Sequence, residues 1–404
     1  MHLKERGAHS VQLLSSLVDC KALGFVGAYV LERALFRLTA RSEKETPSAM
    51  MENRKTGRGV VVGRALGILV LLAGILFAAG LCSASPLGDN PTTSIFQPHS
   101  TPAESIYHLS VFVLVITAVI FLVVFGLLIY AVVKFRSRAT GTDREPAQVY
   151  GSTQIELAWT IIPILIVVVL FLATARVIHA IQDAHKPATA LEVTAIGHQF
   201  WWEFRYPTLG IVTANELHIP VSDPARPTPT FLKLRSADTD HSFWVPRLAG
   251  KTDLIPNHPN HMWIDPHKPG LFLGQCAQYC GTQHAKMLLR VYVQPQGEFE
   301  RWVREQQQTP QSAALSPGQR VFELTACVNC HAISGTPAKG RFGPDLTHIM
   351  SRDTIAAGAA PNTPQKLRLW IKNPDAIKPG SKMPAMGLND QDLDAVTAYL
   401  ETLR

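Results

Sequence analysis

The sequence predicts a multidomain membrane protein: two membrane-spanning helices, then an all-β domain, then an all-α domain. Three observations lead to this prediction. Three uncharged apolar runs lie in the first half of the 404-residue chain, and the second and third are the predicted spans. Short β-like runs separated by Pro- and Gly-rich turns begin after residue 183. A helical pattern begins at residue 316 and continues to the C-terminus.

Residues 1–84 are predicted to be a leader that ends in a signal peptide. Basic residues precede an apolar stretch over residues 65–88, which ends in small residues with a cleavage point near Ala84. Residues 1–50 are either an over-long start or a real extension, because Met51 begins a more typical signal than Met1 does.

Cys82 offers an alternative to signal cleavage, namely a lipid-anchored N-terminus. A small residue is expected directly before such a cysteine, and Leu81 stands there instead. The sequence therefore favours cleavage and leaves lipidation of Cys82 open.

The net charge of +7 is concentrated in the leader. Residues 1–64 carry 11 Lys and Arg against 6 Asp and Glu, whereas residues 65–404 carry 27 against 25. The basic character therefore belongs to the leader, and no nucleic-acid partner is predicted.

Residues 85–182 form the predicted membrane region. Spanning helices are expected at about 109–133 and 157–178, since each uncharged run approaches or exceeds the roughly 20 residues that cross a bilayer. The alternative, buried helices of a soluble core, fits these lengths poorly. Lys134 and Arg136 follow the first run and predict a cytoplasmic loop. We therefore expect a multi-pass protein of the bacterial inner membrane whose later domains face the periplasm.

Two further domains follow the membrane region. Residues 183–305 carry the β-like runs, residues 306–315 form a Gln- and Ala-rich linker, and residues 316–404 are helical. Ser316 followed by Pro317 predicts the start of a helix. Asn389 is expected to cap a last helix whose apolar residues, Leu393, Val396, Leu400 and Leu403, recur at helical spacing.

The run Cys327-Val328-Asn329-Cys330-His331 is the attachment signature of a c-type haem, with His331 as the proximal ligand. Downstream, Gly343-Pro344-Asp345-Leu346-Thr347 and Lys382-Met383-Pro384 make these 90 residues similar to a class I cytochrome c. The resemblance implies that Met383 is the distal iron ligand. Met386 is the alternative distal ligand, and either methionine could instead be an ordinary side chain of the hydrophobic core.

A second group of donors lies in the β region. Cys276, Cys280, His284 and Met287 place two thiols, an imidazole and a thioether within twelve residues. This soft ligand set suits copper. Zinc is the main chemical rival, although it does not normally use Met. A disulfide between the two cysteines is the other alternative.

This loop resembles the binuclear copper motif of cytochrome oxidase subunit II, and the likeness extends over about residues 95–305. Supporting segments are Glu156-Leu157-Ala158-Trp159-Thr160, Gly197-His198-Gln199, His241-Ser242-Phe243-Trp244-Val245-Pro246, Lys251-Thr252-Asp253 and Pro269-Gly270. The resemblance implies a cupredoxin-like Greek-key barrel that holds a binuclear copper A centre. It implies that Cys276 and Cys280 bridge the two coppers and that His241 and His284 bind one copper each. Met287 and the backbone carbonyl of Gln278 would complete the ligand set.

Two positions depart from the family pattern. The family commonly has Glu where Gln278 stands, and that carboxylate helps to hold a magnesium ion at the boundary with subunit I, so the magnesium site is in doubt. Phe200 stands where the family usually has the Trp through which external cytochrome c delivers electrons. Glu156 lies at the cytoplasmic end of the second helix, where the resemblance suggests the entrance of a proton path. The alternative is a solvated carboxylate at a favourable helix end.

The resemblance implies an electron relay. Electrons would pass from cytochrome c, or from the cytochrome bc complex, through haem c and copper A to subunit I, which reduces dioxygen to water and pumps protons. Subunits I and III would be the membrane partners. Two alternatives stay open: the subunit through which electrons enter a copper-containing nitric oxide reductase, and a copper-binding assembly protein without turnover.

Overall fold

The computed structural model describes residues 93–136, 148, 150–223, 227–309 and 316–404. The predicted leader with Cys82 lies outside the described residues, as does most of the loop between the two apolar helices. The chain divides into two compact units, and residues 142–404 belong to a single one of them.

Two helices contain the predicted membrane spans. Helix α3 covers Thr101–Lys134 and helix α4 covers Thr153–Gln182, so each extends beyond the expected boundaries. At 1.5 Å per residue, α3 is about 50 Å long, more than the roughly 30 Å of a hydrocarbon core. Within the described residues, these two helices are long and apolar enough to cross a membrane. Pro163 lies inside α4, as is tolerated in spanning helices.

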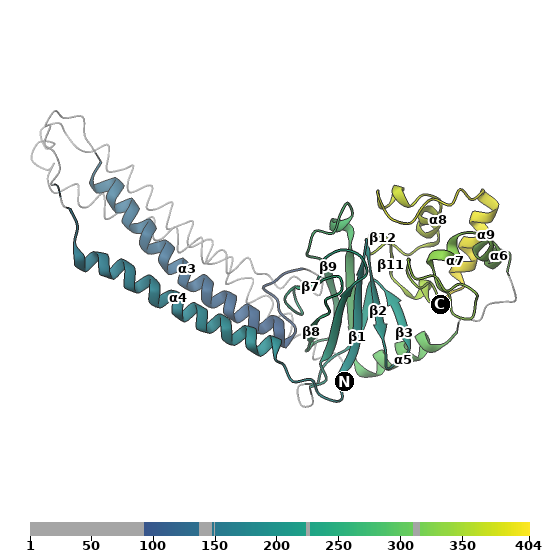
Figure 1. The fold of residues 1–404 in the computed structure, drawn as a ribbon, viewed down its shortest axis with the longest axis horizontal. Coiled ribbons are helices and arrows are strands. Elements are labelled where there is room, and N and C mark those ends of the chain that lie inside the picture. The colour runs from purple at the N-terminus through teal and green to yellow at the C-terminus, as the bar shows by residue number, and fades with distance from the viewer. Residues whose placement is uncertain (1–92, 137–147, 149, 224–226, 310–315) are drawn as a thin grey trace, which may run out of the picture. The chain divides into compact units, whose positions relative to one another are not determined.

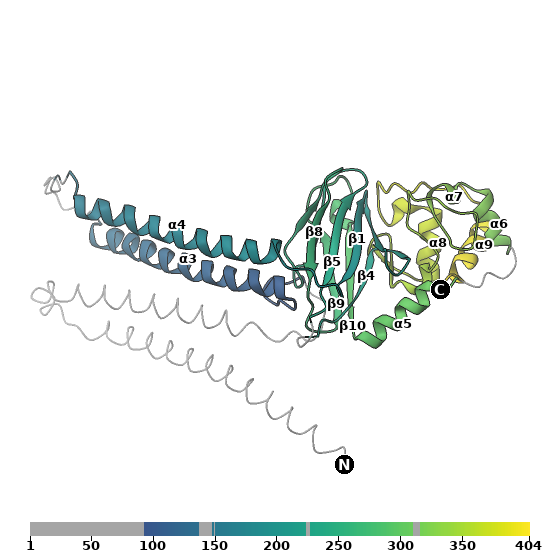
Figure 2. The ribbon, with the colours of Figure 1, turned by 60° about the horizontal axis from the view of Figure 1, so that its bottom comes forward.

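Residues 183–305, called the β domain below, form two five-stranded sheets (Figures 1 and 2). The first has the strand order β3-β2-β1-β5-β8. Its strands are β1 Leu191–His198, β2 Trp201–Tyr206, β3 Ile211–Ala214, β5 Thr230–Ser236 and β8 Asn260–Ile264. The second has the order β4-β10-β9-β6-β7. Its strands are β4 Glu216–Pro220, β6 His241–Trp244, β7 Thr252–Leu254, β9 Gly270–Cys276 and β10 Leu288–Gln294. The pairs β1–β5 and β4–β10 are parallel, and the other pairs are antiparallel.

The core of the β domain is made by side chains that alternate along the strands. In β9 and β10 every second residue is buried, as a sheet with one face inward requires. Trp202, Phe204 and Phe243 are fully buried, and the Trp202 and Phe243 rings meet edge to face at 5.7 Å. The prediction of an all-β domain is confirmed.

Helix α5, Gln296–Gln307, closes the β domain, because its Phe299 and Trp302 side chains pack into the same core. The His218 ring stacks between Tyr292 and Trp302, at centroid distances of 4.7 and 4.4 Å. Burial lowers the pKa of His218 to about 4. The helix includes the first two residues of the predicted 306–315 linker, of which 310–315 lie outside the described residues.

Residues 316–404, called the helical domain below, contain four α-helices. They are α6 Pro317–Leu324, α7 Cys327–Cys330, α8 Pro364–Lys372 and α9 Asp390–Glu401. The two predicted caps are confirmed: the Ser316 side chain accepts from the Gln319 amide, and the Asn389 side chain accepts from the Asp392 amide. The four apolar residues predicted for the last helix, Leu393, Val396, Leu400 and Leu403, are all buried in the core of this domain.

Shorter elements connect these helices and the strands. They are the 3-10 turns η1 His284–Lys286, η2 Ile349–Ser351 and η3 Pro374–Ala376, and a small hairpin of β11 Thr354–Ile355 and β12 Ala360–Pro361. The loop that joins the two hairpin strands has Ala356 and Ala357 at positive φ, 54° and 58°. Non-glycine residues rarely adopt this conformation, so contacts around the loop must hold it in place.

Candidate metal centre and haem-attachment site

The six predicted copper ligands come from two places in the β domain. His241 is the first residue of β6 and is fully buried. The other five lie in residues 276–287, called the ligand loop below, which starts at the end of β9, passes through η1 and ends just before β10. Cys276, Cys280 and Met287 are buried, whereas the side chain of Gln278 is exposed.

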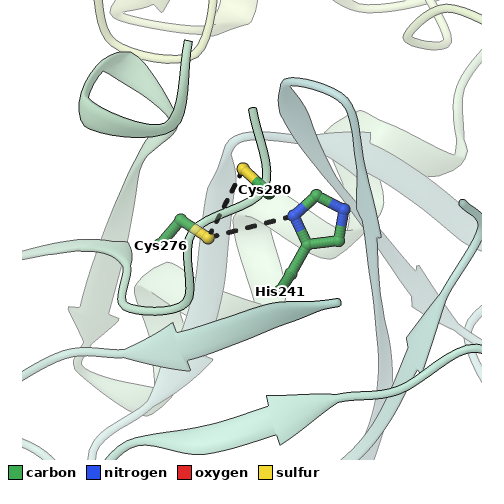
Figure 3. Close-up of side chains that lie close together, drawn as sticks. All are labelled: His241, Cys276 and Cys280. Atoms are coloured by element: carbon green, nitrogen blue, oxygen red, sulfur yellow. Dashed lines mark hydrogen bonds between the residues drawn. The ribbon is translucent and has the colours of Figure 1, made fainter. Parts of the chain in front are cut away.

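The donor atoms of these residues converge on the two cysteine sulfurs. Cys276 Sγ lies 3.9 Å from His241 Nδ1 and 3.9 Å from Cys280 Sγ, and Figure 3 shows dashed lines from it to both atoms. It also lies 3.1 Å from the carbonyl oxygen of Gln278. Cys280 Sγ lies 3.8 Å from His284 Nδ1 and 3.9 Å from the sulfur of Met287. The fold therefore brings all six predicted ligands together, three around each sulfur.

This arrangement fits the copper centre better than its rivals. The cysteines are free thiols at 3.9 Å, whereas a disulfide needs about 2.05 Å between its sulfurs. A structural zinc site takes four N or S ligands, and here a thioether and a carbonyl oxygen also face the thiols. The soft thiol, imidazole and thioether donors are those that copper prefers.

The hydrogen bonds around the Cys276 thiol favour loss of its proton. Contact between the two thiols lowers the pKa of Cys276 and raises that of Cys280, so the pair loses its first proton readily, from Cys276. Burial works against a charge on His241, but its hydrogen bonds outweigh burial and raise the pKa of the ring. Metal ligation needs thiolates and neutral imidazoles; the lowered pKa of Cys276 favours the first thiolate, whereas the raised pKa of His241 works against a neutral ring.

Asp238 orients His241, and the sequence did not single it out. Its Oδ1 lies 2.8 Å from His241 Nε2, so Nε2 donates to the carboxylate and Nδ1 keeps its lone pair toward Cys276. Gly197 lies against the same ring, because a Cβ on it would come within 2.7 Å of His241 Cδ2. The run Asp238-Thr239-Asp240 before His241 offered only a faint signal, since acidic residues are common in turns.

The haem-attachment signature forms one helical turn. Cys327 and Cys330 bound α7, so their thiols lie on one face at i and i+3, and both are free. His331 follows directly, and its Nδ1 donates to the carbonyl of Pro344 at 2.7 Å. Because a carbonyl only accepts, Nε2 carries the lone pair that an iron would need. Gly343 is required beside it, since a Cβ there would lie 2.5 Å from the His331 ring.

Two large apolar side chains close to this signature in the sequence are exposed. Leu324 and Phe342, which flank the motif in the sequence, are 86 % and 84 % exposed despite their size. Met383 and Met386 are both half-buried, so the choice of Met383 as the distal ligand stays a prediction.

Two further residues singled out in the sequence are located by the fold. Glu156 lies exposed in the first turn of α4, where the helix dipole favours a carboxylate, and its role in a proton path stays a prediction. His348, to which no iron ligation was assigned, faces the carbonyls of Arg404 and Gln306 with its two ring nitrogens, at 2.8 and 3.1 Å.

Three protein families match separate parts of the chain. The transmembrane domain family of cytochrome c oxidase subunit II matches residues 89–177, and the periplasmic domain family of that subunit matches residues 225–293. The cytochrome c family matches residues 315–404. Cytochrome c oxidase subunit 2 of Alkalihalophilus pseudofirmus is 33 % identical over 326 residues, which is 79 % of this chain and 92 % of the relative. The chain belongs to the cytochrome c oxidase subunit 2 family.

Other members of the family are similarly distant. Cytochrome c oxidase subunit 2 of Bacillus subtilis is 30 % identical over 335 residues, covering 78 % of this chain and 92 % of the relative. The crystal structure of the periplasmic domain of subunit II of cytochrome oxidase from Bradyrhizobium japonicum shares 28 % identity. It covers 30 % of this chain and 96 % of its own, with a TM-score of 0.28.

Membership of the family settles several predictions. The chain is an oxidase subunit that carries a C-terminal cytochrome c domain, and the oxygen-reducing site lies in another subunit. Its β domain matches the periplasmic domain family of subunit II, for which the resemblance implied a cupredoxin-like barrel. The two families imply a copper centre and a haem c, and the apolar helices anchor an extracellular domain to a membrane.

Proposed function

We propose that this chain is the subunit through which electrons enter a terminal haem–copper oxidase. It receives them from a cytochrome c or a cytochrome bc complex and passes them to subunit I. Dioxygen is reduced to water there, coupled to proton pumping. Subunits I and III are its membrane partners, in the inner membrane of a bacterium, with both extramembrane domains on the periplasmic side.

One observation carries the proposal: two imidazoles, a thioether and a carbonyl oxygen surround two buried thiols that lie 3.9 Å apart. Cys276, Cys280, His241 and His284 would hold the two coppers. Met287 and the Gln278 carbonyl would complete the set. In the helical domain, Cys327 and Cys330 would bond covalently to haem c, and His331 and Met383 would ligate its iron.

When bound, these cofactors take up and give up single electrons, and the protein holds their ligands in place. Asp238 keeps the Nδ1 lone pair of His241 directed at the thiols. The Pro344 carbonyl accepts from Nδ1 of His331, so the lone pair of that ring lies on Nε2. Burial of both cysteines excludes water from the sulfur atoms. A site that is already formed in this way needs little rearrangement when its charge changes.

The experiment is metal and haem analysis of the purified oxidase complex, with optical and electron spin resonance spectra. We expect two coppers and one covalent haem in each chain, and a resonance signal in which one unpaired electron is shared by both coppers. Zinc in the ligand loop, or a Cys276–Cys280 disulfide in active, fully loaded enzyme, would overturn the copper assignment.

A further inference from the structure

Lys378 of the helical domain is buried against the β domain. It is 3 % exposed, and its ammonium group donates to the carbonyls of Phe200 at 2.7 Å and Lys286 at 2.8 Å, both in the β domain. A third bond, of 3.2 Å, goes to the carbonyl of Ala356 in the helical domain. Burial lowers its pKa to about 7. A buried ammonium group is kept only where its hydrogen bonds are satisfied, and here the other domain supplies two of three.

Glu216 makes the opposite connection. It is the first residue of β4 in the β domain and is 2 % exposed. Its carboxylate accepts from the amide of Thr354 at 2.9 Å, the hydroxyl of Thr354 at 2.8 Å and the amide of Asp353 at 3.1 Å, all in the helical domain. Each domain therefore contributes one buried ionisable side chain to the other. Main-chain groups of the other domain make most of the hydrogen bonds of each.

These contacts converge on the ligand loop. Lys286, whose carbonyl Lys378 binds, directly precedes the predicted ligand Met287. Gln283, which directly precedes the predicted ligand His284, donates from its side chain to the carbonyl of Pro379. The amide of Leu288, one residue beyond Met287, donates to the carbonyl of Ala357 at 3.2 Å. The end of the ligand loop is therefore bonded on both sides to the helical domain.

On the helical side, the contacts come from two short segments with fixed geometry. The first is the loop of the β11–β12 hairpin, where Ala356 and Ala357 have positive φ and their carbonyls accept from Lys378 and Leu288. The second is residues 377–380, which lead within a few residues to the predicted iron ligand Met383. Trp201 of the β domain and Ala357 pack together in a small buried apolar cluster. Polar and apolar contacts thus favour one orientation of the two domains.

We propose that Lys378 and Glu216, called the docking pair below, hold the helical domain docked on the ligand loop as a standing part of the oxidase. At this interface Lys378 and Pro379, which lie four or five residues before Met383, contact Lys286 and Gln283, which directly precede Met287 and His284. The role of the docked arrangement in electron transfer rests on the proposed function, whereas the contacts between the domains do not depend on it. It makes the linker at 310–315 a connection between docked domains rather than the device that keeps them together.

The test cuts the linker in the assembled oxidase. A protease recognition sequence is inserted between Gln311 and Ser312, the complex is cleaved and passed over a size-exclusion column, and the helical domain that stays with the complex is measured on a gel. We expect it to co-elute at micromolar concentration, including at about 0.5 M NaCl, because buried contacts are weakly screened. Loss of the helical domain from the cleaved wild-type complex would overturn the proposal.

Matched variants separate docking from folding. Lys378→Met and Glu216→Ala are expected to lower retention at least tenfold, while the exposed controls Lys366→Met and Glu298→Ala retain the domain like wild type. Equal retention in all four variants would also overturn the proposal. Hydrogen exchange on the uncleaved chain gives a second measurement: the peptide with the Asp353 and Thr354 amides should exchange at least tenfold faster in Glu216→Ala.

Copper and haem contents of the same samples keep the two proposals distinguishable. A complex that carries both cofactors but loses its helical domain after cleavage contradicts only the docking pair. A complex that keeps the domain but lacks copper contradicts only the proposed function.

Discussion

The Oδ1 atom of Asp238 lies 2.8 Å from Nε2 of His241, so a carboxylate outside the ligand set fixes the tautomer of a predicted copper ligand. Partners of this kind orient a ligand and raise its basicity, and their loss typically weakens metal binding by about 10- to 100-fold. We therefore expect Asp238→Ala to lose copper to a chelator at a concentration about 10- to 100-fold lower than wild type does. Copper content after graded chelation, followed by the resonance signal, measures this.

Asp240→Ala is the matched control, since Asp240 lies two residues away and is exposed. Asp238 also accepts from the amides of Gln199 and Thr239, so a second variant, Asp238→Asn, keeps a side-chain acceptor for these bonds. If Asp238→Asn and Asp238→Ala both held copper as tightly as wild type, the role given to this carboxylate would be wrong.

Gln278→Ala should keep the copper spectrum. The Gln278 side chain is exposed, and it is the main-chain carbonyl that lies 3.1 Å from Cys276 Sγ. Alanine supplies the same carbonyl, so the ligand set is unchanged. Copper content and the resonance spectrum of the purified complex test this. Loss of both coppers from a correctly folded variant would show that the side chain takes part in the site.

Met383→Leu should lower the potential of the haem or leave its iron five-coordinate. A thioether opposite a histidine stabilises the reduced iron, and leucine offers no donor. Redox titration and the absorption band of thioether-ligated haem measure the change. Met386→Leu is the control, because Met386 is half-buried like Met383 and lies three residues away. The axial assignment would be wrong if only Met386→Leu changed the spectrum.

The features predicted from the sequence are those that depend on residues close together in the chain. The apolar helices, the haem-attachment turn and the ligand loop each lie within about 35 consecutive residues, and their chemistry is visible in the residue types. His241 lies 35 residues from Cys276 and was found only through family resemblance. Interactions over longer separations were missed: Lys378 and Phe200 are 178 residues apart, and Glu216 and Thr354 are 138 apart. A lone lysine or glutamate carries no local pattern that shows its burial.

His218 should make the β domain less stable in acid. Its pKa is about 4 when folded, against 6.5 for an ordinary histidine, because burial between Tyr292 and Trp302 disfavours the charged ring. Below pH 6.5 His218 is protonated in the unfolded chain, whereas in the folded chain it stays neutral until about pH 4. The stability this group contributes is therefore present above pH 6.5 and lost as the pH falls from 6.5 to 4, by on the order of 3 kcal/mol.

The measurement is the thermal midpoint of the full chain in detergent, followed by tryptophan fluorescence between pH 4.5 and pH 7. His218→Phe keeps an aromatic ring in the stack but does not titrate, so its midpoint should fall less steeply with acid than that of wild type. His261→Asn, a change at an exposed histidine of the same domain, should follow wild type. Parallel pH profiles for wild type and His218→Phe would contradict the assignment.

Removal of the helical domain should slow the delivery of electrons from a soluble donor to the β domain. Residues 183–305 carry 12 Asp and Glu and 12 Lys and Arg, so their net charge gives no strong steering of a basic cytochrome. Phe200, at the position where a tryptophan is usual in the family, is buried, and its carbonyl is taken up by Lys378. Lys378 of the helical domain therefore lies against Phe200, and in the proposed relay we expect a soluble donor to meet the helical domain.

A stop codon after Gln308 tests this in the assembled oxidase. Helix α5 ends at Gln307, whose side chain bonds the Leu209 carbonyl at 2.9 Å, so the β domain keeps its closing helix. We expect copper content and assembly to survive while oxygen uptake with added cytochrome c at low salt falls at least about tenfold, or roughly 1.4 kcal/mol in the transfer step. Full-length enzyme with Lys366→Met is the control for assembly. Undiminished turnover of the truncated enzyme would show that the β domain accepts electrons directly, because the truncation removes the covering domain and leaves all six predicted copper ligands in place.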